Sequence, residues 1–111
     1  MAINSREKGK RGERELAKIL QSFGYEGARR GVQYNGADGS ADVIGVPGLH
    51  IECKFVEKLN IDDAMEQSIR DARLGALPVV MHRKNGKPWK VTMLLGDFIE
   101  IYKRAEERED G

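Results

Sequence analysis

Cysteine, histidine and long apolar runs are scarce in this 111-residue sequence. The single cysteine, Cys53, excludes an internal disulfide and fits a reducing, intracellular setting. One cysteine and two histidines are too few for a zinc site built within one chain, so a bound metal is expected to be a hard ion with oxygen ligands. No apolar run approaches the roughly 20 residues that cross a bilayer, and the charged N-terminus lacks the apolar core of a signal peptide. We therefore expect a cytoplasmic protein with no membrane partner.

Charged side chains are abundant, at 33% of the sequence against 40% hydrophobic, as in a soluble globular protein. At this length we expect one domain over 1–111, with a flexible basic arm at 1–8 and a charged tail at 104–111. The net charge of +1 conceals an uneven distribution, because residues 1–34 carry eight lysines and arginines against four glutamates. This basic third is either a phosphate-binding face or a solvated helix surface.

Hydrophobic periodicity and turn residues predict a helix, three strands, a helix, two strands and a final helix. The first helix is expected over 9–23, with Leu16, Leu20 and Phe23 in its packed stripe. The other expected elements are strands at 25–34, 41–46, 49–56, 77–83 and 89–95, a helix at 61–74, and a helix capped by Asp97. The last helix is expected to pack Phe98, Ile99, Ile101 and Tyr102 inward, and Asn85-Gly86 predicts a hairpin turn between the last two strands.

Two neighbouring strands carry the most informative residues of the chain. Side chains alternate between the faces of a strand, so Glu52 and Lys54 share one face of 49–56 while apolar side chains occupy the other. Asp42, at the start of the preceding strand, is expected to point to the same place. Two carboxylates and a lysine converging at a sheet edge provide a divalent-metal site with a cationic helper. These are the smallest set of groups that can hydrolyse a phosphodiester with a metal ion.

Two further polar residues are placed to join this site. Glu13 lies on or next to the N-terminal extension of the packed helical stripe and is expected to point along the sheet, although favourable charge at a helix N-terminus also explains it. Glu15 lies further round the helix and is expected to be solvated. Gln67, on the helix after the Glu-x-Lys strand, is placed to orient a lysine, a water or a phosphate, with an ordinary surface role as the alternative.

Several residues that invite a chemical role are better explained by packing. His50 and His82 each lie in an apolar strand and are expected to be structural instead of general bases. Cys53 faces away from Glu52 and is expected in the core. Trp89 follows a hairpin turn into a strand, so packing is favoured over stacking on a base.

Taken in order, these residues resemble the PD-(D/E)XK nucleases, and within them the archaeal-type Holliday junction resolvases and their phage-encoded relatives. The resemblance covers about residues 6–102. The matching segments are Lys8-Gly9 with Glu13-Arg14, Ala41-Asp42-Val43 for the "PD" strand, Ile51-Glu52-Cys53-Lys54 for the "ExK" strand, and Glu66-Gln67. Alanine stands at 41 where the family usually has proline. The resemblance implies an α/β fold of the restriction-endonuclease type, a mixed central sheet of about five strands flanked by helices.

The resemblance also implies roles for the site residues. Asp42 and Glu52 would bind Mg²⁺, for which Mn²⁺ would substitute, with the backbone carbonyl of Cys53 as a further ligand. Glu13 would bind the metal directly or through water. Lys54 would position the attacking water and offset charge on the phosphate, a role that suits a compact point charge.

The function implied is a Mg²⁺-dependent DNA endonuclease that resolves four-way (Holliday) junctions by symmetric nicking as a homodimer. Candidate DNA contacts are Lys10, Arg11, Arg14, Arg29, Arg30 and Ser40, with surface charge as the alternative for the arginines. The dimer surface is expected near the last two strands and the last helix, with Met81, Trp89, Met93 and Phe98. The alternatives are a nuclease acting on other DNA structures in phage replication or repair, and a nucleic-acid-binding protein without catalysis.

Overall fold

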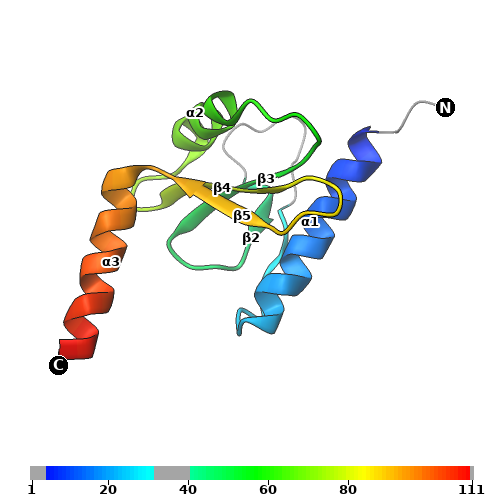
Figure 1. The fold of residues 1–111 in the computed structure, drawn as a ribbon. Helices are drawn as coiled ribbons and strands as arrows, with labels where there is room; N and C mark the ends of the chain where they lie inside the picture. Colours follow the sequence, from blue (N-terminus) through cyan, green and yellow to red (C-terminus); the bar gives the residue numbers. More distant parts are fainter. Residues whose placement is uncertain (1–4, 32–40, 111) are drawn as a thin grey trace.

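The computed structural model describes residues 5–31 and 41–110 (Figure 1). The elements are α1 (Ser5–Ser22), β1 (Arg29–Arg30), β2 (Val43–Ile44), β3 (Leu49–Phe55), α2 (Ile61–Asp71), β4 (Leu77–Arg83), β5 (Lys90–Met93) and α3 (Leu95–Asp110). This order confirms the predicted succession of helices and strands. Ser40 lies outside the described residues.

The five strands form one mixed sheet in the order β1-β2-β3-β4-β5. Only β3 and β4 run parallel, and α2 makes the crossover between them, as parallel neighbours require. In Figure 1, α1 lies against one face of the sheet and α2 against the other. The predicted restriction-endonuclease-like α/β fold, with a five-stranded mixed sheet and flanking helices, is confirmed.

The alternation of side chains along β3 divides the core into two parts. On the α1 side, Leu16 and Leu20 pack on the odd-numbered residues Ile51 and Cys53 of β3. On the α2 side, Ala64 and Met65 pack on Val80 of β4. The even-numbered residues of β3, which include Glu52, therefore belong to the α2 side of the sheet.

The N-terminal helix is longer and ends earlier than its sequence indicates. It begins at Ser5, so residues 5–8, expected to be a flexible arm, are helical as described. It ends at Ser22, and Phe23, predicted to be packed, is 76% exposed. Gly24 adopts a φ of +107°, which turns the chain directly after Phe23 and ends the helix.

The C-terminal helix contradicts two predictions. It begins at Leu95, so Asp97 lies in its first turn and does not cap it. Its apolar residues are exposed by about 40–50% instead of packed inward, namely Phe98, Ile99, Ile101 and Tyr102. Within the described part of the chain, α3 makes no extensive contact with another element, and Figure 1 shows it projecting from the sheet. Helical spacing identifies an apolar face but does not say what covers it.

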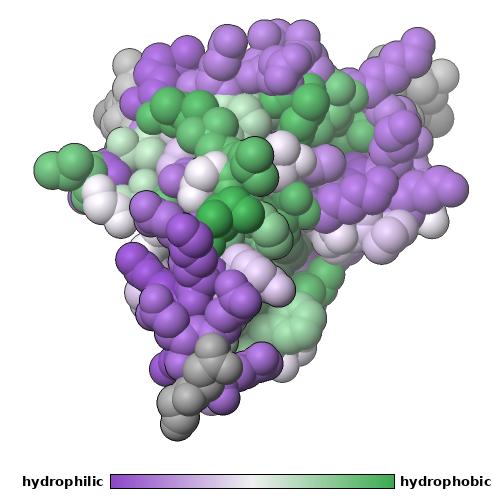
Figure 2. All heavy atoms as spheres, turned by 60° about the vertical axis from the view of Figure 1, so that its left-hand side comes forward, coloured by the Kyte–Doolittle hydropathy of each residue, from purple (hydrophilic) through white to green (hydrophobic). Residues whose placement is uncertain are grey.

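The apolar face of α3 continues onto the body of the protein. Leu94 and Val91, next to α3 and on β5, are also exposed. Figure 2, which brings α3 toward the viewer, shows apolar side chains gathered in the middle of this side and hydrophilic ones over the outer part of the helix. None of the described helices is long and apolar enough to span a membrane.

Candidate active site

Asp42 and Glu52 lie next to each other at one end of the β2–β3 pair, where the Asp42 carboxylate acts on the charge of Glu52. Val43 pairs with Ile51 in antiparallel register. The Asp42 N–H also donates to the Ile51 carbonyl at 2.9 Å, so Asp42 and Val43 both face Ile51, as at a β-bulge. The Cys53 N–H donates to Asp42 Oδ2 at 2.8 Å. The strand pair thus holds both carboxylates at one place, as the sequence predicts.

The Glu52 side chain is buried with half of its carboxyl group unsatisfied. Only 1% of the residue is exposed. Its Oε1 lies 3.2 Å from His50 Nε2, whereas Oε2 has no hydrogen-bond partner among the described residues. Burial, the charge of the nearby Asp42 carboxylate and a hydrogen bond between the two carboxyl groups raise the pKa of Glu52 to about 8. Since buried polar atoms in proteins are normally paired, this oxygen is placed to meet a cation or a hydrogen-bond donor.

His50 supports the Glu52 carboxyl from the same strand. The two residues are two positions apart on β3 and therefore share a face. Burial lowers the pKa of His50 and favours a neutral ring. A neutral ring with its proton on Nε2 donates to Glu52 Oε1. The prediction of a packed histidine is confirmed, but its contact with Glu52 was missed, although their two-residue spacing carries that signal.

Lys54 and Cys53 occupy opposite faces at the end of β3. The Lys54 charge acts on Glu52 and opposes the rise in the pKa of that carboxyl, so the lysine lies near the carboxylates. Cys53 is buried among the residues packed by α1, and burial raises the pKa of its thiol. Cys53 is therefore a core thiol, as predicted, and not a thiolate nucleophile.

Glu13 reaches the carboxylates from α1. Burial and Asp42 both raise the pKa of Glu13, while a hydrogen bond from Arg30 opposes them. That bond joins Arg30 Nε to Glu13 Oε1 at 3.2 Å. Arg30 is positioned by its pairing with Val43. The structure therefore brings Glu13 toward the site, and it pairs Arg30, a candidate DNA contact, with a carboxylate that the sequence did not connect to it.

The remaining candidates lie around this centre. Gln67 is half-buried on α2, and no contact in the described part of the chain joins it to the carboxylates. Arg29 is exposed and donates to the Gly27 carbonyl at 2.9 Å. Arg11 and Arg14 are exposed on α1.

Lys10 forms an ion pair with Glu7 at 3.7 Å within the first turns of α1. An exposed pair of this kind contributes little to stability and leaves the lysine accessible. Lys10, Arg11 and Arg14 can therefore meet a ligand. Lys8 of the same helix, in contrast, is largely covered and pairs with Glu57.

Glu15 is not solvated as predicted but joins α1 to the β4–β5 hairpin. Its Oε1 accepts from Trp89 Nε1 at 2.8 Å, and its Oε2 accepts from Arg83 Nη2 at 3.2 Å. The Arg83 guanidinium also lies 4.2 Å from the centroid of the Phe55 ring. Glu15 lies outside the core, as its place on the helix predicts. The β4–β5 hairpin extends beyond the core, however, and covers Glu15. Trp89 is packed, as predicted.

The two carboxylates suit a hard divalent ion that keeps several of its waters. They do not form a site in which side chains supply every ligand. Among residues 5–31 and 41–110, no group of three histidine, cysteine, aspartate or glutamate side chains is arranged to hold a metal. Mg²⁺ needs fewer, because it is usually bound by one or two carboxylates and keeps several waters. Asp42 and Glu52, with the unsatisfied Oε2, provide that donor set.

Comparison with known proteins agrees with this architecture. Residues 4–109 match the family described as "Phage putative PDDEXK endonuclease". No curated protein and no solved structure gives a significant match. The family match spans nearly the whole chain, and the mixed five-stranded sheet with flanking helices is the fold expected of such a nuclease. The protein therefore belongs to this family of PD-(D/E)XK endonucleases.

Proposed function

We propose that this nuclease is a Mg²⁺-dependent endonuclease that resolves four-way DNA junctions by paired, symmetric nicks as a homodimer. The observation that carries the metal dependence is the buried Oε2 of Glu52, which has no donor among the described residues and lies beside the Asp42 carboxylate. Burial first, and then the charge of the neighbouring Asp42 carboxylate, raise the pKa of Glu52, so the two ionised carboxylates are costly to hold together. A divalent cation between them would offset that cost.

The proposed roles follow from where each side chain lies. Asp42 and Glu52 would hold the metal, with the Cys53 carbonyl as a further ligand and Glu13, paired with Arg30, acting through water. Bound Mg²⁺ supplies a more acidic water and stabilises charge on the phosphate. Lys54, on the face of Glu52, would orient the attacking water and offset the developing charge. Gln67, half-buried on α2, would orient the substrate.

The DNA would lie over the basic side of α1 and β1. The cations there are Lys10, which is half-buried, and Arg11, Arg14 and Arg29, which are exposed. Ser40 is kept as a proposed contact on the resemblance alone. The preference for a four-way junction also rests on the resemblance. Symmetric nicking of a junction needs two active sites, and a homodimer supplies them.

Cleavage of a labelled four-way junction beside linear duplex of the same arms tests this proposal. The reaction is run with Mg²⁺ and with EDTA. Paired symmetric nicks in the junction alone, lost in EDTA, are expected. Equal cutting of both substrates would keep the nuclease and remove the junction preference. No cutting with either Mg²⁺ or Mn²⁺ would instead favour a binding protein without catalysis.

The exposed face of α3 is the proposed dimer surface. Of the residues expected there from the sequence, Met81 lies in the core and Trp89 and Met93 pack against it. Phe98 remains available and stacks on Tyr102, with ring centroids 6.2 Å apart. An apolar face of this kind is normally covered by a partner.

Replacing Phe98 and Tyr102 by aspartate together is therefore expected to convert a dimer into monomers, because it puts charge into the apolar contact. Molar mass from light scattering coupled to gel filtration measures the change. Lys103→Asp with Arg104→Asp, which also adds two aspartates to α3, is the matched control and should stay dimeric. A wild-type monomer, or a dimer that survives the Phe98 and Tyr102 changes, would rule out this interface.

A further inference from the structure

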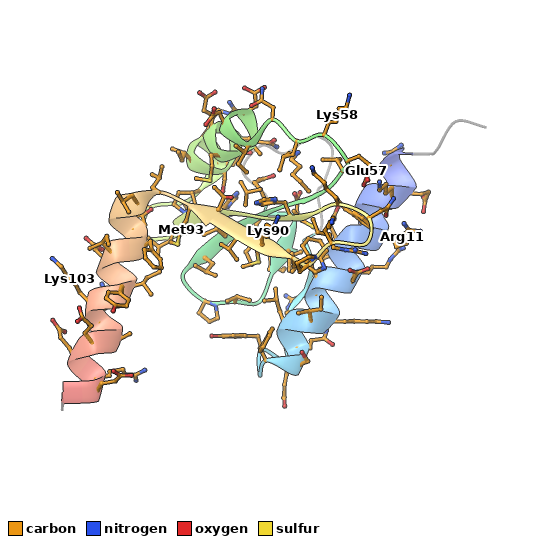
Figure 3. The ribbon with its side chains drawn as sticks, in the orientation of Figure 1. Arg11, Glu57, Lys58, Lys90, Met93 and Lys103 are labelled. Atoms are coloured by element: carbon orange, nitrogen blue, oxygen red, sulfur yellow. The ribbon has the colours of Figure 1, made fainter. Side chains whose placement is uncertain are left out.

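A cavity of about 360 Å³ lies between the segment that leads from β3 into α2 and the β4–β5 hairpin. The joining segment contributes Lys58, Leu59 and Ile61 to its wall, and the hairpin contributes lysines and Pro88. Figure 3 labels Lys58 in the segment before α2 and Lys90 on β5, lower in the view, with Lys103 far away on α3. We name this cavity the lysine groove.

The charge of the lysine groove is strongly positive. Its lining lysines are Lys58, Lys84, Lys87 and Lys90. All four are exposed, and no salt bridge engages them in the part of the chain that the structure describes. Like charges gathered without partners repel one another, so the groove is prepared for an anion.

The one carboxylate among the described lining residues is occupied elsewhere. Glu57 Oε2 accepts from the Asn85 N–H at 2.9 Å and lies 3.5 Å from Lys8 Nζ. The hydrogen bond from Asn85 is the main reason that the pKa of Glu57 is lowered, with Lys8 and Lys84 adding to it. Glu57 therefore holds the hairpin turn and α1 together and leaves most of the lysine charge uncompensated.

The floor of the groove is held in place by contacts that do not involve the lysines. His82 Nε2 lies 2.9 Å from Thr92 Oγ1, and Arg83 is held by Glu15 and the Phe55 ring. Leu59, Ile61 and Pro88 give the wall an apolar portion. A site with fixed walls, mobile cations and apolar patches suits a phosphate joined to a sugar better than a bare inorganic ion.

The groove continues the face of the sheet that carries the carboxylates. Lys54 pairs with His82 across β3 and β4, and His82 pairs with Lys90 across β4 and β5. Paired residues point to the same side of a sheet, so Lys54, His82 and Lys90 form one row on the side of Glu52. Neighbouring strands are about 4.8 Å apart, which places the row over about 10 Å. One strand of DNA carries a phosphate about every 3.4 Å of helix axis, so the row covers the rise of about three nucleotides.

We propose that the lysine groove holds backbone phosphates of the nucleic acid strand that leaves the cutting site, on the side opposite to α1. The inference rests on the proposed function, because it takes Lys54 to lie beside the scissile phosphate. Lys58, Lys87 and Lys90 contact the phosphates, and the apolar wall contacts the sugar. The groove adds a second DNA surface to the basic residues of α1 and lengthens the bound segment without reading its sequence.

DNA binding without cleavage tests the proposal. A fluorescent junction and a duplex are titrated in EDTA with wild type and with the variant Lys58→Ala, Lys87→Ala, Lys90→Ala. Loss of three phosphate contacts is expected to raise Kd by at least about tenfold and to lower the slope of log K against log salt by about 2 to 3. The control is Lys103→Ala, Arg104→Ala, Arg108→Ala, which removes three exposed cations from α3 and is expected to change the slope little.

Cleavage kinetics separate this proposal from the proposed function. With a wild type that cuts, the groove variant is expected to raise KM and leave kcat nearly unchanged, because its lysines bind the strand away from the reacting atoms. If the wild type does not cut, the proposed nuclease mechanism is wrong. A smaller salt slope for the groove variant than for the wild type would still support DNA binding by the groove. Equal slopes for the groove variant, the control and the wild type would overturn the groove.

A variant with one charge reversed keeps the test valid if the triple variant does not fold. Lys87 lies in the exposed turn between β4 and β5. Lys87→Glu is expected to weaken binding with the melting temperature unchanged. Unchanged binding by this folded variant would also count against the groove.

Discussion

Asp42→Asn is expected to reduce cleavage by at least about a thousandfold while leaving DNA binding in EDTA unchanged. The amide oxygen can still accept from the Cys53 N–H, as Asp42 Oδ2 does at 2.8 Å, so the strand pair is preserved. The lost charge removes half of the carboxylate pair proposed to hold Mg²⁺. Metal catalysis is worth several kcal/mol, and each 1.4 kcal/mol is a factor of ten in rate.

The measurement pairs single-turnover cleavage with calorimetric titration of Mn²⁺. Asp62→Asn is the matched control, because it makes the same chemical change on an exposed residue in the first turn of α2. Glu52→Gln should behave as Asp42→Asn does. Cleavage by either variant at the rate of the control would show that these carboxylates do not hold the metal.

Gly45→Ala is expected to destabilise the protein by more than about 3 kcal/mol. Gly45 has a φ of +99°, which costs an alanine about 1 kcal/mol or more. An added Cβ would also overlap the Gly27 carbonyl and lie 2.7 Å from the Ala28 Cα. These are backbone atoms, so no side chain can rotate away, and the link between β2 and the segment before β1 must move.

Gly48→Ala provides the control, because Gly48 has a φ of +85° and open space where the Cβ would lie. It should cost only the conformational term, about 1 kcal/mol. Thermal unfolding measures both variants, and the melting temperature should fall by about 5 °C for Gly48→Ala and about 15 °C or more for Gly45→Ala. Equal losses would show that the close approach to Gly27 is not maintained in solution.

The sequence predicts the site best where the prediction depends on local geometry. Alternation along β3 places Glu52 and Lys54 on one face and Cys53 in the core, and the short hairpin between β2 and β3 brings Asp42 close to Glu52. Such relations involve neighbouring residues and follow from the period of a strand. They did not require knowledge of the rest of the fold.

The sequence predicts least where distant segments meet. The Glu13–Arg30 pair depends on how α1 crosses β1, and the contacts of Glu15 depend on a hairpin almost seventy residues away. The prediction that α3 packs its apolar face inward is wrong for a related reason. The spacing of Phe98 and Tyr102 indicates that one face of the helix is apolar, but a face buried in the core and a face at a subunit interface show the same spacing.

The contacts of Glu15 also determine which parts of the molecule open together. Arg83 is 68 residues from Glu15, whereas Val43 and Ile51 at the site pair across a hairpin of eight. Closing the longer loop costs about 2 kcal/mol more chain entropy. Because α1 carries both Glu13 and Glu15, detachment of this one helix would remove an acidic group from the carboxylates and at the same time release Arg83, which holds the floor of the lysine groove. The two surfaces thus share a single cooperative unit of local unfolding.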